Sequence, residues 1–428
     1  MSSIIVQKYG GATLADPQKI KQVAARLARL SKSGARVIVV VSAMGKSTNQ
    51  LIELAQQVSQ NPNRRELDML LSTGERVSMS LLSIALNDLN CQAISFTGSQ
   101  AGILTNNSHL NAYIADVKSP RIEKALSEGK IVVLAGFQGV SPESKEITTL
   151  GRGGSDITAM AIASAMKASR CEILKDVDAV FTADPKTVTA AKPIHHLTYE
   201  QLMEMTFWGA KVLHYRSVEL AFRNQLPLYI GPAATLDEGT INSKEGTLVD
   251  TKLNLKSKNL IGETMFESNK VLGINSHELV LQLECEHESL GTALAELEEK
   301  LEKFEIAAPQ VLNTLMSGNK IQLFVTGPLE VLQAIQREFR SSPTKTDEAK
   351  TIEAKKKKIT LFEKELSAVA VTCTGSFNTE MPKRISTILE KNKISITSML
   401  MSPMSLVMLI ERSQKNLAIK VLHELIEK

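Results

Sequence analysis

Apolar runs that alternate with amphipathic segments constrain the fold of the first half of the chain more than any other feature. The helix-type segments include 17–30, 155–166 and 199–224. The apolar, strand-type runs are IIVQKY (4–9), RVIVVVSAM (36–44), AISF (93–96), KIVVLAGF (130–137) and CEILKDV (171–177). Continuously apolar strands between helices are typical of a parallel sheet covered on both faces. We therefore predict an α/β fold whose ligands bind at the carboxyl ends of the strands.

The second half has a different pattern. A strand over 277–285 and a helix over 289–304 are followed by a second strand and helix, and a similar series starts at residue 367. This pattern predicts two small α+β modules. We accordingly predict one domain over 1–250 and a second region over 251–428, in which the charged segment 344–358 is a linker or a solvated helix.

Composition excludes several classes of protein. A chain of 428 residues with a net charge of +4 is long enough for two or three domains, and it lacks the concentrated basic face of a nucleic-acid-binding protein. No apolar run approaches the roughly 18 residues of a membrane span, and the start shows no signal-peptide pattern. The scattered cysteines form no zinc spacing or disulfide framework, so we expect no protein metal site and a cytoplasmic location; they are Cys91, Cys171, Cys285 and Cys373.

Two glycine-containing turns follow the first two strands. Gly10 and Gly11 follow a strand that carries Lys8, a pattern that lets backbone approach a phosphate, although an ordinary turn beside a surface lysine explains it equally well. The run GKST (45–48) resembles the end of a P-loop, but Val40 stands where the first glycine of that motif is needed. We reject a P-loop here and predict a turn that presents the Ser42 and Thr48 hydroxyls to a polar ligand.

The run TTLGRGGSD (148–156) is the most informative one. Its glycines surround Arg152, and a helix is expected to begin near Ser155, so backbone N–H groups and a guanidinium could form an anion site. The alternative is a glycine-rich loop with Ser155 or Asp156 as the N-cap. We favour the anion site, because a turn of this kind has no need of an arginine.

Three further runs are ambiguous when each is taken alone. STGER (72–76) places Glu75 and Arg76 near an expected helix start, which capping and a solvated ion pair explain. The aspartates of KDVDAVFTADPK (175–186) suit either Asx-turns or the orientation of a nucleotide. GAKVLHYRS (209–217) is expected to put Lys211 and His214 on one helical face.

Taken together and in this order, the runs of residues 4–250 resemble the aspartate kinase family, which has the amino-acid kinase fold. The matching pieces are KYGG, VVVSAMG, STGE, FTGSQAGI (96–103), AGFQG (135–139), TTLGRGGSD, DVDAVFTADP and GAKVLH with RSVELA. The resemblance implies transfer of the γ-phosphoryl group of Mg-ATP to the side-chain carboxylate of aspartate. This is the first step toward lysine, threonine and methionine.

The resemblance also implies roles for individual residues. Lys8 would contact the transferring phosphoryl group, and Arg152 with Ser155 would bind an aspartate carboxylate. Ser42, Thr48 and Glu75 would hold aspartate, with Glu75 facing its ammonium group. The implied catalytic residues are Lys8, Arg152 and Asp176. The implied nucleotide site consists of Lys8, Tyr9, Gly10, Gly11, Asp176, Thr182, Ala183, Asp184, Lys186, Lys211 and Val212.

The sequence also departs from the family pattern. Threonine usually stands at the positions of Ala12 and Lys175, tyrosine at Phe181 and proline at Tyr215. The second half resembles paired ACT modules, which in this family bind lysine or threonine and join subunits. The usual Pro-Gly turn is replaced by residues 289–291. We therefore expect altered, weak or lost effector binding in a homodimer or larger homo-oligomer. A non-catalytic amino-acid sensor and a kinase for another acid are the alternatives.

Overall fold

The structure is a computed structural model, and it forms two units. It describes residues 3–233, 245–250, 270–287, 289–304, 306–339, 359–362, 364–374 and 379–426. The expected linker at 344–358 lies outside the described residues. The first unit consists of Met1–Phe181, Lys192–Phe207 and Lys211–Thr264, and the second of Thr182–Ala191, Trp208–Ala210 and Met265–Lys428.

The first unit is built on a mainly parallel sheet. Its eight described strands have the order β12-β14-β13-β9-β1-β2-β6-β3. Their bounds are β1 (Ile4–Tyr9), β2 (Arg36–Val41), β3 (Ala93–Phe96), β6 (Ile131–Ala135), β9 (Arg170–Lys175), β12 (His196–Leu197), β13 (Leu228–Pro232) and β14 (Thr247–Val249). The described neighbours pair in parallel, apart from β13 and β14. The predicted α/β class is therefore confirmed.

The strand order places a binding edge beside β1. The chain passes from β1 to β2 on one side, and β9 later joins the other side of β1. In open α/β sheets, ligands bind where the strand order reverses in this way, outside the carboxyl ends of the strands. Lys8 pairs with Ile173 in register, so Lys8 and Lys175 lie near this edge on adjacent strands.

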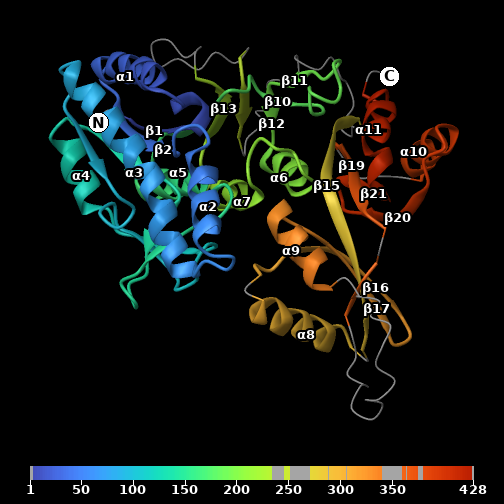
Figure 1. Ribbon diagram of the computed structural model, residues 1–428. Coiled ribbons are helices and arrows are strands. Elements are labelled where there is room, and N and C mark those ends of the chain that lie inside the picture. Colours follow the sequence, from blue (N-terminus) through green and yellow to red (C-terminus); the bar gives the residue numbers. More distant parts are fainter. Residues whose placement is uncertain are drawn as a thin grey trace. The chain divides into compact units, whose positions relative to one another are not determined.

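Helices cover both faces of this sheet (Figure 1). Helices α1 (Pro17–Lys32) and α3 (Arg64–Asp88) share an apolar core with residues such as Ile5, Val37 and Tyr9. Alternate strand residues point to the opposite face, where α5 (Gly154–Ala165) packs against β1, β2 and β9. The remaining helices of this unit are α2 (Ser47–Val58), α4 (Pro120–Ser127), α6 (Tyr199–Phe207) and α7 (Tyr215–Arg223).

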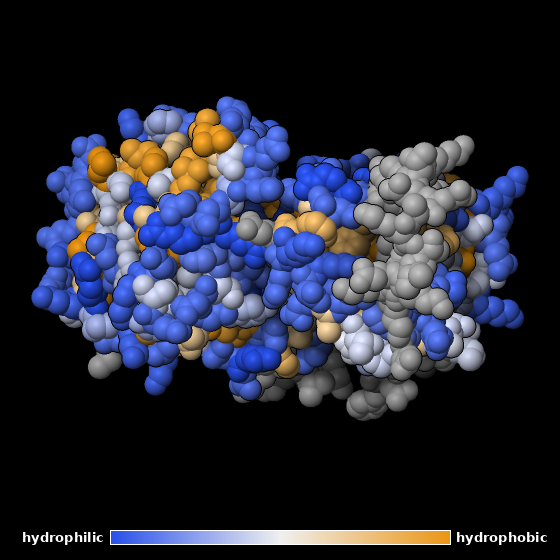
Figure 2. Space-filling view, turned by 60° about the horizontal axis from the view of Figure 1, so that its bottom comes forward, coloured by the Kyte–Doolittle hydropathy of each residue, from blue (hydrophilic) through white to orange (hydrophobic). Residues whose placement is uncertain are grey.

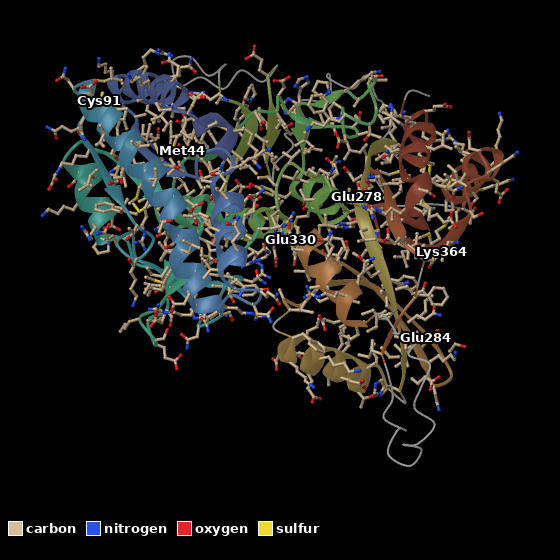
Figure 3. All side chains as sticks on the ribbon, in the orientation of Figure 1. Met44, Cys91, Glu278, Glu284, Glu330 and Lys364 are labelled. Carbon is tan, nitrogen blue, oxygen red and sulfur yellow. The ribbon has the colours of Figure 1, made fainter. Side chains whose placement is uncertain are left out.

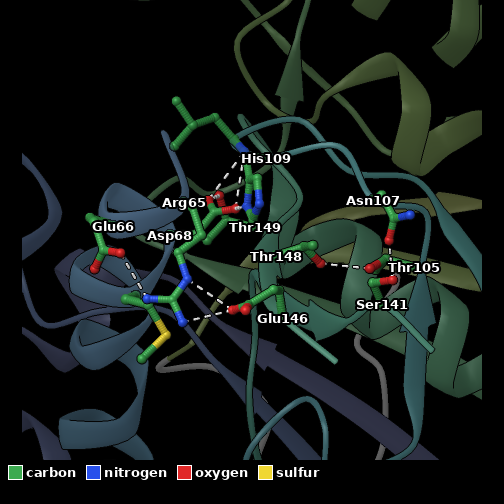
Figure 4. Close-up of polar contacts among 12 residues, drawn as sticks. Arg65, Glu66, Asp68, Thr105, Asn107, His109, Ser141, Glu146, Thr148 and Thr149 are labelled. Atoms are coloured by element: carbon green, nitrogen blue, oxygen red, sulfur yellow. Dashed lines mark hydrogen bonds and ion pairs between the residues drawn. The ribbon is translucent and has the colours of Figure 1, made fainter. Parts of the chain in front are cut away.

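This unit has a second sheet of four strands, which contacts α3 through buried hydrogen bonds (Figure 4). Its order is β5 (Ile114–Val117), β4 (Ile103–Thr105), β7 (Gln138–Val140) and β8 (Ile147–Thr149). The fully buried Asp68 accepts hydrogen bonds from Thr149 Oγ1 at 2.5 Å and from Leu110 N at 3.1 Å, and it lies 2.6 Å from His109 Nδ1. Burial raises the pKa of Asp68, although these contacts lower it in part.

The second unit has one sheet that two modules share. Its order is β16-β17-β15-β19-β21-β20, and β18 also pairs with β15. The strands are β15 (Val271–Glu286), β16 (Gln310–Ser317), β17 (Lys320–Thr326), β18 (Thr360–Leu361), β19 (Leu366–Cys373), β20 (Ile396–Met401) and β21 (Ser405–Glu411). The first part of β15 pairs with β19 and its last part with β17.

Each part of this sheet has its own pair of helices. Helices α8 (Leu290–Lys303) and α9 (Leu329–Phe339) form one apolar core, and α10 (Glu380–Lys391) and α11 (Lys415–His423) form the other. The two predicted α+β modules are therefore confirmed. The predicted strand 277–285 is only the second half of the 16-residue β15 that joins them.

The segment Thr182–Ala191 belongs to the second unit. Ala183 and Val188 lie in the apolar core around α10 and α11. Thr182 accepts a backbone hydrogen bond from Ile274 at 2.7 Å, and its hydroxyl lies 2.9 Å from Nε2 of the buried His423. The chain therefore crosses between the units more than once, which the single expected boundary at residue 250 does not describe.

The described residues on the face shown in Figure 2 are mainly hydrophilic, with groups of apolar residues among them. On α2 and α3 the exposed apolar side chains are Leu54, Val58, Val77, Leu81 and Ile84. Among the helices that the structure describes, none has the length and apolar character needed to span a bilayer.

Candidate functional site

A cleft of about 390 Å³ lies at the predicted edge of the first unit's sheet. Its walls come from the loops after β1 and β2, from α3 and from the start of α5. The lining residues are Lys8, Gly11, Ser42, Ala43, Gly45, Lys46, Thr48, Asn49, Glu75, Phe137, Gly151, Gly153, Gly154, Ser155 and Asp156. Six of the predicted site residues thus meet in one cleft, namely Lys8, Gly11, Ser42, Thr48, Glu75 and Ser155.

The two glycine-containing turns pack directly on each other. A Cβ at Gly11 would lie 2.7 Å from Ala43 O, so no side chain fits there. Gly45 N donates a hydrogen bond of 3.0 Å to Gly11 O, while Gly10 N donates to Leu174 O at 3.1 Å. The Gly10 N–H is therefore engaged within the sheet, and Gly11 is needed for contact between the loops. Figure 3 labels Met44, which stands in the second of these turns.

Two lysines share one buried carboxylate at the floor of the cleft. Lys8 Nζ lies 2.7 Å from Asp156 Oδ1, and Lys175 Nζ lies 3.3 Å from Asp156 Oδ2. Burial alone would raise the pKa of Asp156, but the positive charges of Lys175 and Lys8 outweigh burial and the pKa is lowered. Asp156 is therefore ionised. Burial lowers the pKa of Lys175, and Asp156 offsets this effect in part.

Glu75 presents one unpaired oxygen in the same cleft. Its Oε1 accepts a hydrogen bond of 3.1 Å from Ala43 N, whereas Oε2 is buried and has no hydrogen-bond partner among the described residues. Gly74 makes this approach possible, because a Cβ there would lie 2.9 Å from Ala43 Cβ. Burial raises the pKa of Glu75 to about 7. A carboxyl group held in this way suits a cationic ligand group.

The glycine-rich loop and Phe137 form the wall beside the start of α5. Gly153 caps this helix with φ +71°, and a Cβ at Gly154 would lie 2.6 Å from Phe137 Cδ2. Phe137 itself has φ +70°, a conformation that is costly for a bulky residue. The helix N-terminus at this wall is suited to an anion.

Other predicted site residues lie outside this cleft. Arg152 and Asp176 are exposed and are not among its lining residues. The Tyr9 side chain is fully buried in the core with α1 and α3, and burial raises its pKa, so only its backbone remains available to a ligand. The residues Thr182, Ala183, Asp184 and Lys186 belong to the second unit.

Two local predictions are wrong. Glu75 and Arg76 lie in the middle of the 25-residue helix α3, not near its start. Lys211 and His214 do not share a helical face, because Lys211 lies in the turn before α7 and His214 is the N-cap of that helix. Burial lowers the pKa of His214 to about 4, so the ring is neutral near pH 7.

Sequence reasoning missed several residues of the site. The sequence indicates Asp156 only as a candidate helix cap, and Lys175 only as a departure from the family pattern. Lys46, Asn49 and Phe137 carried no local signal, although Lys46 belongs to the GKST run. The useful signal for Asp156 is its position in the first turn of a helix that follows a glycine-rich loop.

Comparisons with known proteins agree with this geometry. The model of the amino acid kinase family matches residues 3–232, more than half of the chain, so the chain belongs to this family. An aspartokinase of Mycolicibacterium smegmatis is 51% identical over 239 residues, which are 56% of this chain and 57% of that protein. An aspartokinase of Bacillus sp. (strain MGA3) is 49% identical over 57% of this chain and 59% of its own length. The matches thus span less than two thirds of these relatives.

Solved structures extend the likeness to nearly the whole chain. The aspartate kinase from Synechocystis is 32% identical with a TM-score of 0.52, over 99% of this chain and 69% of that one. E. coli aspartokinase III in complex with aspartate and ADP has a TM-score of 0.76 over 99% of this chain and 100% of that one. Its 23% identity supports the shared fold alone.

Proposed function

We propose that the chain is an aspartate kinase, which transfers the γ-phosphoryl group of ATP to the side-chain carboxylate of L-aspartate and forms 4-phospho-L-aspartate. The observation that carries this proposal is the cleft in which the Lys8–Asp156 pair and the unpaired Glu75 oxygen face one space. Lys8 suits an anionic group, and Glu75 suits an ammonium group. The model of the amino acid kinase family matches residues 3–232, a range that contains every residue lining this cleft.

The acceptor would bind through its ammonium group at Glu75. The unpaired oxygen of Glu75 lacks a donor among the described residues, and an ammonium group supplies one. Ser42 and Thr48 line the same cleft and can bind the acceptor's polar groups. Arg152 is proposed as a further contact to a carboxylate of aspartate. Selectivity for an amino acid would follow from the Glu75 contact.

The chemistry requires positioning and charge neutralisation more than proton transfer. The side-chain carboxylate of free aspartate has a pKa of about 3.9, so the nucleophile is already ionised near pH 7. The main barrier is the repulsion between this anion and the triphosphate. Lys8 and the N-terminus of α5 would hold the phosphoryl group and oppose that repulsion.

Magnesium would enter bound to the nucleotide. The described residues contain no group of three or more metal-ligating side chains, and both oxygens of Asp156 already contact lysines. Mg²⁺ binds well through phosphates and water, where it neutralises phosphate charge. Asp176, Lys211 and Val212 are proposed for the rest of the nucleotide site, together with the segment 182–186.

The second unit is proposed to act as a regulatory region and to join subunits. One structure of E. coli aspartokinase III holds lysine and aspartate, which motivates a test of amino-acid effectors. In this chain Ser289 caps α8 and accepts a hydrogen bond from Thr292 N at 3.2 Å. We expect altered, weak or lost inhibition by lysine or threonine, in a homodimer or larger assembly.

The decisive experiment is an acyl-phosphate assay with the full chain. Mg-ATP and L-aspartate should give a product that hydroxylamine traps, and Lys8→Ala should reduce its rate about 10²–10³-fold. The assay should include lysine and threonine, singly and together, and a panel of other acids. No product above the Lys8→Ala level would favour a non-catalytic sensor, and preference for another acid would favour a related kinase.

A further inference from the structure

Lys175 is a partly buried lysine that no part of the proposed mechanism uses. It ends β9, only 18% of its side chain is exposed, and it is not among the residues that line the cleft. Its ammonium group donates a hydrogen bond to the Val212 carbonyl and contacts Asp156 Oδ2 at 3.3 Å. Burial of a cation is costly unless it is paired, so these contacts fix where the side chain lies.

The charges at the floor of the cleft do not cancel. Asp156 carries one negative charge, while Lys8 and Lys175 carry two positive charges. Without Lys175, Asp156 would contact Lys8 as its only cation of this cluster, and the two charges would cancel. Because the site excludes much of the solvent, such a difference of one charge acts strongly over a few ångströms. These three groups together carry one net positive charge, which Asp176 near Lys175 and Glu75 near Lys8 offset in part, so the loss of the Lys175 charge would leave Lys8 less able to attract an anion.

We propose that Lys175 is a positioning residue that acts through Asp156 to leave the charge of Lys8 available to a bound polyphosphate. Lys175 contacts Asp156 Oδ2 at 3.3 Å, while Lys8 contacts Oδ1 at 2.7 Å. Through the Val212 carbonyl, Lys175 also holds the turn before α7 at the same edge of the sheet. The identity of the polyphosphate as ATP rests on the proposed function, but the charge argument does not.

The test compares polyphosphate binding in variants that separate charge from anchoring. Lys175→Met removes charge and hydrogen bonds, Lys175→Gln removes the charge but can still donate to Asp156 and Val212, and Lys175→Arg keeps the charge. Lys130→Met is the matched control, because Lys130 pairs with Glu128 at 2.6 Å at the amino end of β6. The probes are inorganic tripolyphosphate, ADP and adenosine, measured by titration calorimetry.

Lys175→Met and Lys175→Gln should weaken tripolyphosphate and ADP binding about tenfold or more, since a buried charge contact is lost, and should leave adenosine binding unchanged. Lys175→Arg and Lys130→Met should bind all three probes like the wild type. In steady-state kinetics, the neutral variants should raise KM for ATP and leave KM for aspartate within about twofold, because Glu75 is untouched. A merely structural defect would change both constants and the melting temperature.

Variants made in an Asp156→Asn background test whether Lys175 affects polyphosphate binding through the Asp156 carboxylate. If Lys175 acts through the Asp156 carboxylate, Lys175→Gln should cost much less in that background than in the wild type. Wild-type tripolyphosphate affinity in Lys175→Gln, or an equal loss in both backgrounds, would overturn the inference. A wild type that binds tripolyphosphate but makes no aspartyl phosphate would defeat the proposed function and leave this inference standing.

Discussion

At the scale of single residues, burial determines which side chains of the cleft can act. The sequence was sufficient to propose Lys8 and Glu75 only through the ordered set of runs that resembles the aspartate kinase family, because the run around each residue is ambiguous on its own. It was not sufficient for Asp156, because a helix cap and a buried counter-ion look the same in a sequence. Only the packing of α5 beneath β1 and β9 distinguishes them.

Glu75 should make aspartate binding depend on pH. Burial raises the pKa of Glu75 to about 7, and an ammonium group binds best to the ionised carboxylate. As the pH falls below 7, KM for aspartate should therefore rise about tenfold per pH unit, since one proton must be lost on binding. The same profile measured with Glu75→Gln should be flat at a high KM. An unchanged slope in that variant would remove Glu75 from the ammonium site.

Glu75 should also lower the stability of the free protein at alkaline pH. The folded pKa of about 7 exceeds the ordinary value of 4.5, so the folded state binds the proton more tightly than the unfolded state. The resulting stabilisation is present below about pH 4.5 and is lost as the pH rises through 7. Urea unfolding should measure the difference in free energy of unfolding between Glu75→Gln and the wild type at pH 5 and at pH 8. Between these two pH values the difference should change in favour of Glu75→Gln by up to about 3 kcal/mol.

Arg152 should affect aspartate use without affecting stability. It is exposed between Gly151 and Gly153, whose positive φ values fix the loop, so its removal breaks no core packing. If it binds a carboxylate of aspartate, Arg152→Ala should raise KM for aspartate about tenfold or more and change ADP affinity less than about twofold. Equal losses for both ligands, or an unchanged KM for aspartate, would contradict the assignment.

At the scale of secondary structure, long periodic elements were predictable and short ones were not. The segments 4–9, 17–30 and 93–96 match β1, α1 and β3 closely, because each carries a full apolar pattern. The four-stranded sheet was missed, since its strands of three or four residues are too short to show a period. It depends instead on contacts distant in sequence, such as Asp68 with Thr149.

Helix α3 also shows why helix propensity alone gives the wrong sign for one substitution. Gly→Ala in a helix gains about 1 kcal/mol, but overpacking costs about 1–3 kcal/mol. A Cβ at Gly74 would lie 2.9 Å from Ala43 Cβ, whereas at Gly291 of α8 the nearest atom would be 3.9 Å away. Thermal unfolding should therefore show Gly74→Ala as neutral to destabilised and Gly291→Ala as stabilised.

The kinetic consequence of Gly74→Ala should be larger than its effect on stability. The substitution displaces the Glu75 carboxylate from Ala43 N, so KM for aspartate should rise several-fold. Gly291→Ala is the matched control and should leave KM unchanged. A stable Gly74→Ala protein with normal KM would show that the loop after β2 adapts to the added methyl group.

At the scale of the whole molecule, the boundaries between the two units were harder to predict from the sequence than the fold class. The strand–helix series that occurs twice after residue 250 indicated the two α+β modules correctly. The composition around 182–191 gave no sign that this segment packs with the second unit, because Ala183 and Val188 are its only buried apolar anchors among the described residues of that segment. Segments of this kind are assigned by tertiary contacts that lie far apart in the sequence.

The contact between Thr182 and His423, which both belong to the second unit, provides a test of the proposed nucleotide role of the segment 182–186. The Thr182 hydroxyl and His423 Nε2 are both buried and 2.9 Å apart. Thr182→Val keeps the shape but leaves the histidine nitrogen without this contact, which should cost about 1–3 kcal/mol in urea unfolding. Thr387→Val is the control, because the Thr387 hydroxyl donates within α10 at an exposed position.

The kinetic readout of the same pair tests the proposed nucleotide role of 182–186. If this segment contributes to the nucleotide site, its loosening in Thr182→Val should raise KM for ATP several-fold and leave KM for aspartate unchanged, since Glu75 and its neighbours belong to the first unit. Thr387→Val should change neither constant. Reduced stability with an unchanged KM for ATP would remove Thr182–Lys186 from the nucleotide site and restrict nucleotide contacts to the first unit.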